Sequence, residues 1–289
     1  MSNAAVYEKI TNAIIASLES GNIPWIKPWK ASNTVNYNVP HNVISKKSYR
    51  GINRLYLSCM MNYTSNTWGT FKQWKSIGAS VRKGEKGTEV VYFQPIVVKS
   101  AKNENEEDKV FPLLKTYYVF NADQVEGYVA PVVELSEEEK MANNQQVNAF
   151  IESVGANIRH GGDEAYFSPS LDYIQMPVVS SFISEDAYYG VLFHELTHWT
   201  GHKTRLDRLN LGKFGSSEYA FEELVAELGS AFLSQNMSIN SDQLRHAGYI
   251  QGWVKCLKEH KNAIFRAAAL AQTAVDYLTS TKEEGDYDE

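Results

Sequence analysis

The feature that most constrains this chain is the run His194-Glu195-Leu196-Thr197-His198. On a helix, residues four apart share one face, so both imidazoles can bind a single Zn²⁺ ion. Glu195 follows the first histidine and is placed to accept a proton from a metal-activated water. The flanking residues are apolar nearly all round the helix, which argues against a surface helix that merely carries two histidines. The motif therefore predicts a zinc site of the kind that hydrolyses peptide bonds.

A catalytic zinc site needs a third protein ligand and keeps its fourth position open. In the metzincin pattern, a Gly lies three residues after the second His and a third His lies three residues further on. Gly201 is present here, but the last position is Thr204. His202 is one turn beyond His198, yet Gly201 is expected to end the helix between them. We therefore reject the metzincin pattern and do not expect His202 to be a ligand.

The following helix offers a better third ligand in the run Glu222-Glu223-Leu224-Val225-Ala226-Glu227. Glu223 and Glu227 share one face among apolar residues, and buried carboxylates need a partner. The alternative is that all three are solvated helix charges. In this arrangement the chain resembles the gluzincin class of peptidases, whose downstream helix supplies a Glu ligand. The resemblance implies that Glu223 is the ligand and that Glu227 holds a ligand histidine. Glu222 is expected on the surface.

Two further parts of a peptidase site are less well defined by the sequence. The segment 172–177 is a candidate strand at the rim of the cleft, where an extended substrate could pair with it. A group that stabilises the oxyanion is also needed. Tyr219, Arg205, His246 and His260 are candidates, and the sequence does not choose among them.

The order of predicted elements divides the 289 residues into two parts. The first part has helices predicted over 5–20, 50–62 and 70–77, and strands over 90–98 and 114–120 joined by a polar loop. The second part is mostly helical, with helices predicted over 136–153, 182–200, 217–236, 241–257 and 260–279. Three short strands are predicted within it, over 156–159, 165–167 and 171–176.

These elements predict an α+β protein of two domains. The first, residues 5–127, is a small α+β domain, and a linker covers 128–135. The second, residues 136–281, is mostly helical with a small sheet. The last residues, 282–289, are acidic and lack apolar anchors, so we expect them to be disordered.

Charge is distributed unevenly between the two parts. Residues 1–95 hold 12 Lys and Arg against 4 Asp and Glu, whereas the remainder holds 16 against 30. A basic part joined to an acidic part suggests that the first binds an anion, with nucleic acid as the leading candidate. Small basic domains are also common without such a partner.

Four of the six tryptophans lie in the same basic part. Proteins that bind single-stranded nucleic acid combine a positive groove with aromatic side chains on which bases stack. Tryptophans also fill the core of small domains, so we expect only two or three of these aromatic residues to contact bases. The candidate DNA-binding residues are Trp25, Lys27, Trp29, Tyr49, Arg50, Trp68, Phe71, Trp74, Arg82, Lys83 and Lys86.

The chain shows no sign of secretion or membrane insertion. Cys59 and Cys256 form neither a metal-spaced pair nor a disulfide framework, which favours a reducing cytoplasm. No apolar run approaches the length of a membrane span, and the start has no signal-peptide pattern. We therefore expect a cytoplasmic protein without a membrane partner.

Two sets of motifs together resemble one known family. The run 68–74, followed by Gly78 and by the run 81–87, is similar to the N-terminal domain of the ArdC antirestriction proteins. The runs 194–202 and 219–228 are similar to the zincin-like C-terminal domain of the same family. The resemblance covers nearly the whole chain in the right order. It implies a protein of conjugative plasmids and other mobile elements that binds single-stranded DNA and shields incoming DNA from restriction.

The combined prediction is a single-stranded-DNA-binding domain joined to a zinc-dependent peptidase. His194, His198 and Glu223 would hold Zn²⁺, and Glu195 would be the general base. Two alternatives stay open: a DNA-binding shield with a structural zinc, and a peptidase whose N-terminal domain recognises an acidic protein. A nuclease is less favoured, because this ligand set suits peptide hydrolysis more than two-metal phosphodiester chemistry. The protein substrate and the oligomeric state are not predicted.

Overall fold

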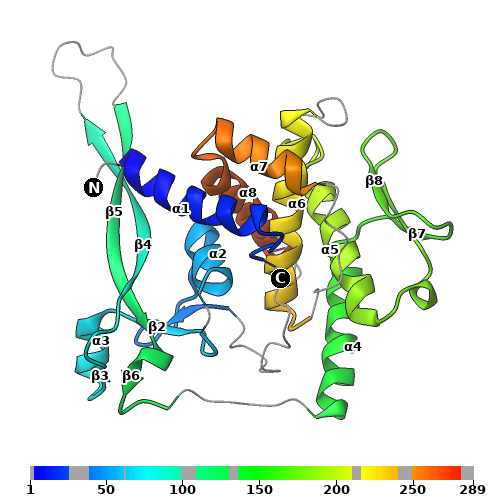
Figure 1. Ribbon diagram of the computed structural model, residues 1–289. Coiled ribbons are helices and arrows are strands. Elements are labelled where there is room, and N and C mark those ends of the chain that lie inside the picture. The colour runs from blue at the N-terminus through cyan, green and yellow to red at the C-terminus, as the bar shows by residue number, and fades with distance from the viewer. Residues whose placement is uncertain are drawn as a thin grey trace, which may run out of the picture.

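The computed structural model describes residues 3–25, 39–61, 63–98, 109–129, 136–209, 216–239 and 249–280. Figure 1 shows a long β-ribbon at one side, a group of helices in the middle and a small sheet at the opposite side. Within the described ranges there are eight α-helices and nine strands in three sheets. This mixture confirms the α+β class. The predicted loop 101–109, most of the linker, the first half of the helix predicted over 241–257 and the acidic tail lie outside the described residues, apart from Lys109.

The N-terminal part combines three helices with two sheets. Its helices are α1 (Asn3–Glu19), α2 (Gly51–Cys59) and α3 (Phe71–Ser76). Its larger sheet has the order β1-β2-β5-β4, formed by β1 (His41–Asn42), β2 (Thr67–Gly69), β5 (Lys109–Asn121) and β4 (Thr88–Val98). The smaller sheet pairs β3 (Ser80–Val81) with β6 (Val125–Glu126). Strands β1, β2, β3 and β6 were not expected, because two or three residues are too few to show an alternating pattern.

Local sequence explains where these elements begin. Thr70 caps α3, because its hydroxyl accepts a hydrogen bond from the Gln73 backbone while the Gln73 side chain accepts one from Thr70 N–H. Strands β4 and β5 are antiparallel and pair residue by residue, with Thr88 opposite Val119 and Tyr92 opposite Lys115. This ribbon carries β-branched and aromatic residues, as expected for strands.

The C-terminal part contains five helices and a three-stranded sheet. The helices are α4 (Glu137–Val154), α5 (Glu185–Thr200), α6 (Ser217–Asn236), α7 (Ile250–Glu259) and α8 (Ala263–Ser280). The sheet has the order β7-β9-β8, with β7 (Ile158–His160), β9 (Tyr173–Met176) and β8 (Tyr166–Ser168). Because β9 lies between the other two strands, the expectation that 172–177 is a rim strand is wrong.

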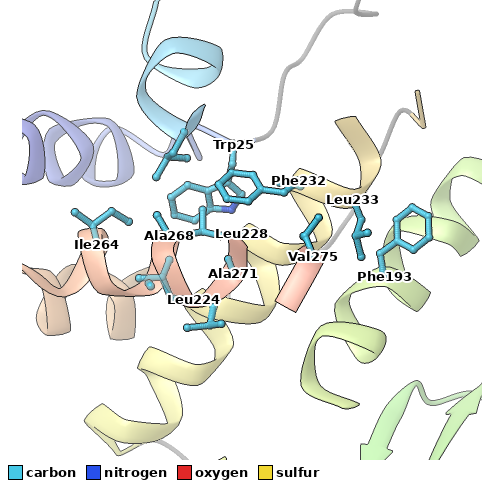
Figure 2. Packing of buried hydrophobic residues seen from close by; sticks show 14 of the residues in the cluster. Trp25, Phe193, Leu224, Leu228, Phe232, Leu233, Ile264, Ala268, Ala271 and Val275 are labelled. Carbon is cyan, nitrogen blue, oxygen red and sulfur yellow. The ribbon is translucent and has the colours of Figure 1, made fainter. Parts of the chain in front are cut away.

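The two parts share one continuous hydrophobic core. Apolar residues of α1 and α2 lie in the same buried cluster as those of α5, α6 and α8. The Trp25 ring packs edge-on against Trp253 with ring centroids 5.4 Å apart, and Figure 2 shows Trp25 among residues of α6 and α8. Thr11 of α1 also donates a hydrogen bond to the Lys261 carbonyl at 2.6 Å. The domain limits 5–127 and 136–281 stay a prediction, but residues on both sides of them contact one another.

A buried arginine joins α2 to the end of α6. Arg54 is 2% exposed and donates hydrogen bonds to the Phe232 carbonyl, the Gln235 side chain and the Asn236 side chain, at 2.6, 2.7 and 3.0 Å. Burial lowers the pKa of Arg54 to about 9, so it still carries its charge at neutral pH. A cation at the C-terminal end of a helix satisfies the last carbonyls and complements the helix dipole. An N-terminal residue thus anchors the helix that carries Glu223.

Helices α5 and α6 cross very closely because small residues face each other. A Cβ atom added at Gly229 of α6 would lie 2.4 Å from the side chain of Thr197 on α5. Close by, the Ser230 hydroxyl donates a hydrogen bond to the Gly190 carbonyl at 2.8 Å. Thr197 lies inside the His-Glu-x-x-His motif, so this crossing fixes how near α6 comes to the two histidines.

We predict that Gly229→Ala lowers the free energy of unfolding by about 1–3 kcal/mol, because the new methyl group forces α5 and α6 apart. The effect should appear in spite of the better helix propensity of Ala. Urea denaturation measures it. Gly252→Ala in α7 is the matched control, since its Cβ would meet Ala220 at an ordinary 3.4 Å. Equal stability of the two variants would contradict the close crossing.

Candidate metal centre

The two histidines of the motif converge on one face of α5. Ser184 caps the start of the helix, because its hydroxyl accepts a hydrogen bond from Ala187 N–H, and Gly201 caps its end after Thr200. The Nε2 atoms of His194 and His198 lie 3.1 Å apart. Both side chains are largely buried, so their polar atoms need partners inside the protein.

Glu223 reaches the same point from α6. Its carboxylate oxygens lie 3.5 Å from His194 Nε2 and 3.5 Å from His198 Nε2. A tetrahedral ion with bonds of about 2.1 Å holds neighbouring ligand atoms about 3.4 Å apart. The three separations in the structure, 3.1, 3.5 and 3.5 Å, lie close to this spacing. Within the described ranges, no other group of three His, Cys, Asp or Glu side chains converges in this way.

Each histidine is held from behind by a carboxylate. His194 Nδ1 lies 3.3 Å from Glu227 Oε1, and His198 Nδ1 lies 3.1 Å from Glu222 Oε1. An ionised carboxylate can only accept, so each Nδ1 carries a hydrogen, and each Nε2 is the atom that binds a metal once its own proton is lost. The two Nε2 atoms and the Glu223 carboxylate face one another, and the positive charge that balances them is supplied either by protons on Nε2 or by a bound metal ion. These residues therefore fit a divalent metal ion.

Glu222 corrects the expectation that it lies on the surface. It is 6% exposed and accepts hydrogen bonds from Arg208 Nε at 3.0 Å and Arg208 Nη2 at 2.9 Å. Arg208 follows α5, and its backbone N–H donates to the Gly201 carbonyl, which turns the chain back toward α6. Sequence reasoning missed both residues, because no local pattern shows that α6 is covered on this side.

The electrostatics of the cluster suit a cation. Burial by itself lowers the pKa of a histidine, but hydrogen bonds to Glu222 and Glu223 outweigh burial and raise the pKa of His198 to about 9. In the same way, Glu223 and Glu227 raise the pKa of His194 well above its ordinary value. Burial works against ionisation of Glu223, yet the two histidines hold its pKa well below the usual range. The carboxylates around the histidines thus favour positive charge at this position.

A cavity of about 240 Å³ lies over the cluster, so the site is open on one side. Glu195 lines it beside the two histidines and Glu223. Its other walls come from α6, the cap of α7, the segment after α5 and the β8 segment. The lining residues are Tyr219, Tyr249, Leu209, Ala165, Tyr166, Phe167 and Pro169. Strand β8 is an edge strand of its sheet. It therefore lies at the rim of the cleft, where we expected the segment 172–177.

The four candidates for the oxyanion stabiliser separate clearly. Tyr219 lines the cavity, and burial together with the charge of Glu223 raises its pKa, so the phenol keeps its proton. Arg205 is occupied elsewhere, by the Trp199 carbonyl at 2.6 Å and by Asp172. His260 lines a different cavity, behind Glu222, and His246 lies outside the described residues.

His202, the rejected third ligand, is not among the residues that converge on the cluster. Its Nδ1 lies 2.8 Å from the Thr204 hydroxyl, and the helix ends before it, as expected.

The predicted DNA-binding residues fall into several groups. Trp25, Trp68 and Trp74 are 6%, 0% and 0% exposed, so the expectation that bases stack on them is wrong. Each fills a core: Trp68 packs with Leu57 and Val90, and the Trp74 indole donates a hydrogen bond to the Phe120 carbonyl at 3.0 Å.

The remaining candidates lie nearer the surface. Tyr49 is partly buried against the Trp68 cluster, and Arg50 forms an ion pair with Asp276 of α8. Arg82 is exposed but bonds to Glu85 at 2.9 Å and to the Asp123 carbonyl. Three candidates remain exposed: Phe71, Lys83 and Lys86. Neither lysine forms an ion pair with another described residue. Lys27 and Trp29 lie outside the described residues.

The helices in the described ranges are all too short or too polar to cross a membrane.

Comparison with known families matches two descriptions along the chain. Residues 4–120 match the N-terminal domain of anti-restriction factor ArdC, and residues 145–270 match a zincin-like metallopeptidase domain.

Individual relatives extend the similarity over nearly the whole chain. The protein y4eC of Sinorhizobium fredii (strain NBRC 101917 / NGR234) is 37% identical over 294 residues, covering 98% of this chain and 94% of that protein. A DNA primase TraC of Escherichia coli is 35% identical over 96% of this chain, which spans only 20% of TraC.

Two crystal structures of the antirestriction protein ArdC from plasmid R388 are also similar. The metal-free structure is 39% identical with a TM-score of 0.78, and covers 95% of this chain and 97% of its own. The Mn(II)-bound structure is 36% identical with a TM-score of 0.75, and covers 96% and 98%. Similarity of this extent, with both domain descriptions in the same order, shows that the chain belongs to the ArdC family of antirestriction proteins and carries a zincin-like domain.

Proposed function

We propose that this protein is a zinc-dependent peptidase that works beside single-stranded DNA bound by its N-terminal part. The observation that carries the proposal is the convergence of His194, His198 and Glu223 at metal-ligand spacing on the floor of an open cavity. A metal with a purely structural role is usually enclosed by four protein ligands. Here three ligands converge, and Glu195 lies beside them in the cavity.

The chemistry of the ligand set favours zinc over other divalent ions. Two imidazoles and one carboxylate are typical of catalytic zinc sites, whereas manganese prefers sites richer in oxygen. For a given set of ligands, zinc also binds more tightly than manganese. The carboxylates behind both histidines increase their basicity and fix their orientation, as in known zinc sites.

The protein's own residues then divide the steps of peptide hydrolysis among them. Zinc at this position would supply Lewis acidity, which acidifies water and polarises the scissile carbonyl. Glu195 accepts the proton of the attacking water and returns it to the leaving amine. The Tyr219 phenol donates a hydrogen bond to the carbonyl oxygen as negative charge develops on it. The free edge of β8 orients an extended substrate through backbone hydrogen bonds.

The DNA-binding part of the proposal rests on charge and on family membership. The first 95 residues hold 12 Lys and Arg against 4 Asp and Glu. A basic surface attracts the phosphates of any nucleic acid. Since the family is one of antirestriction proteins, we infer that the protein protects incoming DNA of a mobile element in the cytoplasm. Its peptidase substrate would then be a protein encountered on that DNA.

We predict that Glu195→Gln lowers peptide cleavage by at least about a hundredfold while the bound zinc stays near one ion per chain. Cleavage of a proteome-derived peptide library, followed by mass spectrometry with and without single-stranded DNA, measures the first effect, and elemental analysis measures the second. The control is Glu185→Gln, an exposed residue of the same helix. Cleavage that is absent from the wild type, or unchanged in Glu195→Gln, would favour the DNA-binding shield with a structural metal.

We predict that Glu222→Gln weakens zinc binding about 10- to 100-fold, because His198 loses the carboxylate that orients it. Competition with a chromogenic chelator measures the affinity. Glu218→Gln, an exposed change one turn earlier on α6, should bind zinc like the wild type. Equal affinities of both variants would show that Glu222 serves only to pair with Arg208.

A further inference from the structure

Three aromatic side chains gather where the β4–β5 ribbon meets α3. The rings of Phe71 and Phe120 pack edge-on with centroids 6.4 Å apart. Tyr118 is two residues before Phe120 on β5, so both side chains lie on the same face of the strand. Phe71 and Tyr118 are 55% and 51% exposed, so much of each ring is open to solvent. We call Phe71, Tyr118 and Phe120 the aromatic platform.

Gly87 lies beside the platform and, having no side chain, leaves the Phe120 and Tyr118 rings open on that side. The register of the ribbon places Thr88 opposite Val119, so Gly87 lies opposite Phe120. A Cβ atom at Gly87 would lie 3.1 Å from the Phe120 ring and 3.1 Å from Tyr118 Cβ. Any larger residue here would push against both aromatic residues. The backbone therefore passes close beneath the rings without covering them.

Four lysines lie close to the platform residues along the chain, on α3 and on the turn before β4. Lys72 and Lys75 lie on α3, and Lys75 shares a helix face with Phe71 because the two are four residues apart. Lys83 and Lys86 lie on the turn that leads into Gly87. All four are exposed, and none is paired with a carboxylate in the part of the chain that the structure describes. Arg82 does not belong to this set, because Glu85 already pairs with it.

We propose that the aromatic platform stacks the unpaired bases of single-stranded DNA while Lys72, Lys75, Lys83 and Lys86 contact its phosphates. Exposed rings bordered by cations are the combination that single-strand binders use. In a duplex the bases are already stacked on each other, so only a single strand can use the rings. An acidic peptide would be attracted by the lysines but would gain little from the rings. This inference rests on the proposed DNA binding and assigns it a surface.

The opposite face of the same ribbon provides a matched control. Tyr92 and Tyr117 are 55% and 48% exposed, comparable with the platform residues. Tyr117 directly precedes Tyr118 and therefore points to the other face, as does Tyr92, which pairs with Lys115. Two aromatic residues of comparable exposure can thus be removed from the opposite face as a control.

The test uses the full-length protein and the fluorescence anisotropy of a labelled oligo-dT strand and of a hairpin duplex. Phe71→Ala with Tyr118→Ala should weaken binding of the single strand roughly tenfold for each ring, and should hardly change binding of the duplex. Tyr92→Ala with Tyr117→Ala should bind like the wild type. Lys83→Gln with Lys86→Gln should reduce the slope of log affinity against log salt by about 1.4, from two lost phosphate contacts. Circular dichroism checks that each variant is folded.

The outcomes separate the surface from the function. If the wild type binds the single strand and both aromatic double variants bind equally well, the platform is wrong while DNA binding stands. If the wild type fails to bind at low salt, the proposed DNA binding fails as well. A third outcome is that a poly-glutamate peptide displaces the oligonucleotide and binds the Phe71→Ala, Tyr118→Ala variant more weakly than the wild type. In that case the surface binds an acidic protein.

Discussion

The close crossing of α5 and α6 is the constraint on which the rest of the structure depends. Gly229 has no side chain, so Thr197 of the motif can occupy the space beside it. This close contact of the two helices brings the carboxylates of α6 to the imidazoles of α5. The metal-ligand spacing, the carboxylates behind the histidines and the cavity above them all follow from it. The histidines alone would define a possible metal site, whereas the crossing selects which carboxylates complete it.

The N-terminal part also supports this crossing. Trp25 packs on Trp253 of α7, and Arg54 of α2 holds the last turn of α6 through three hydrogen bonds. Removing these contacts would leave buried carbonyl and amide groups without partners. The basic part and the metal centre therefore contact each other through one continuous hydrophobic core.

Much of the fold and part of the site could be predicted from local patterns. The bounds of α6 and the start of α3 follow from caps and periodicity, and the burial of Glu223 follows from its apolar surroundings. Its assignment as the third ligand comes from the resemblance to gluzincins. Glu222 could not be predicted, because its partner Arg208 arrives from a distant turn. Nor can composition tell a stacking tryptophan from a core tryptophan, and here Trp68 and Trp74 are core. The sequence predicts β9 at the rim of the cleft, but β8 is the edge strand there. The order of strands in a sheet cannot be deduced from the sequence of one strand.

X-ray absorption at the zinc edge of protein loaded with one equivalent of zinc tests the central claim most directly. The account predicts two imidazole nitrogens and carboxylate oxygen at about 2.0–2.1 Å, with water in the remaining position. It also predicts that one imidazole is lost from this shell in His198→Ala. A shell that contains sulfur, or one that is unchanged when His198 is removed, would contradict the assignment of His194, His198 and Glu223 as the ligands.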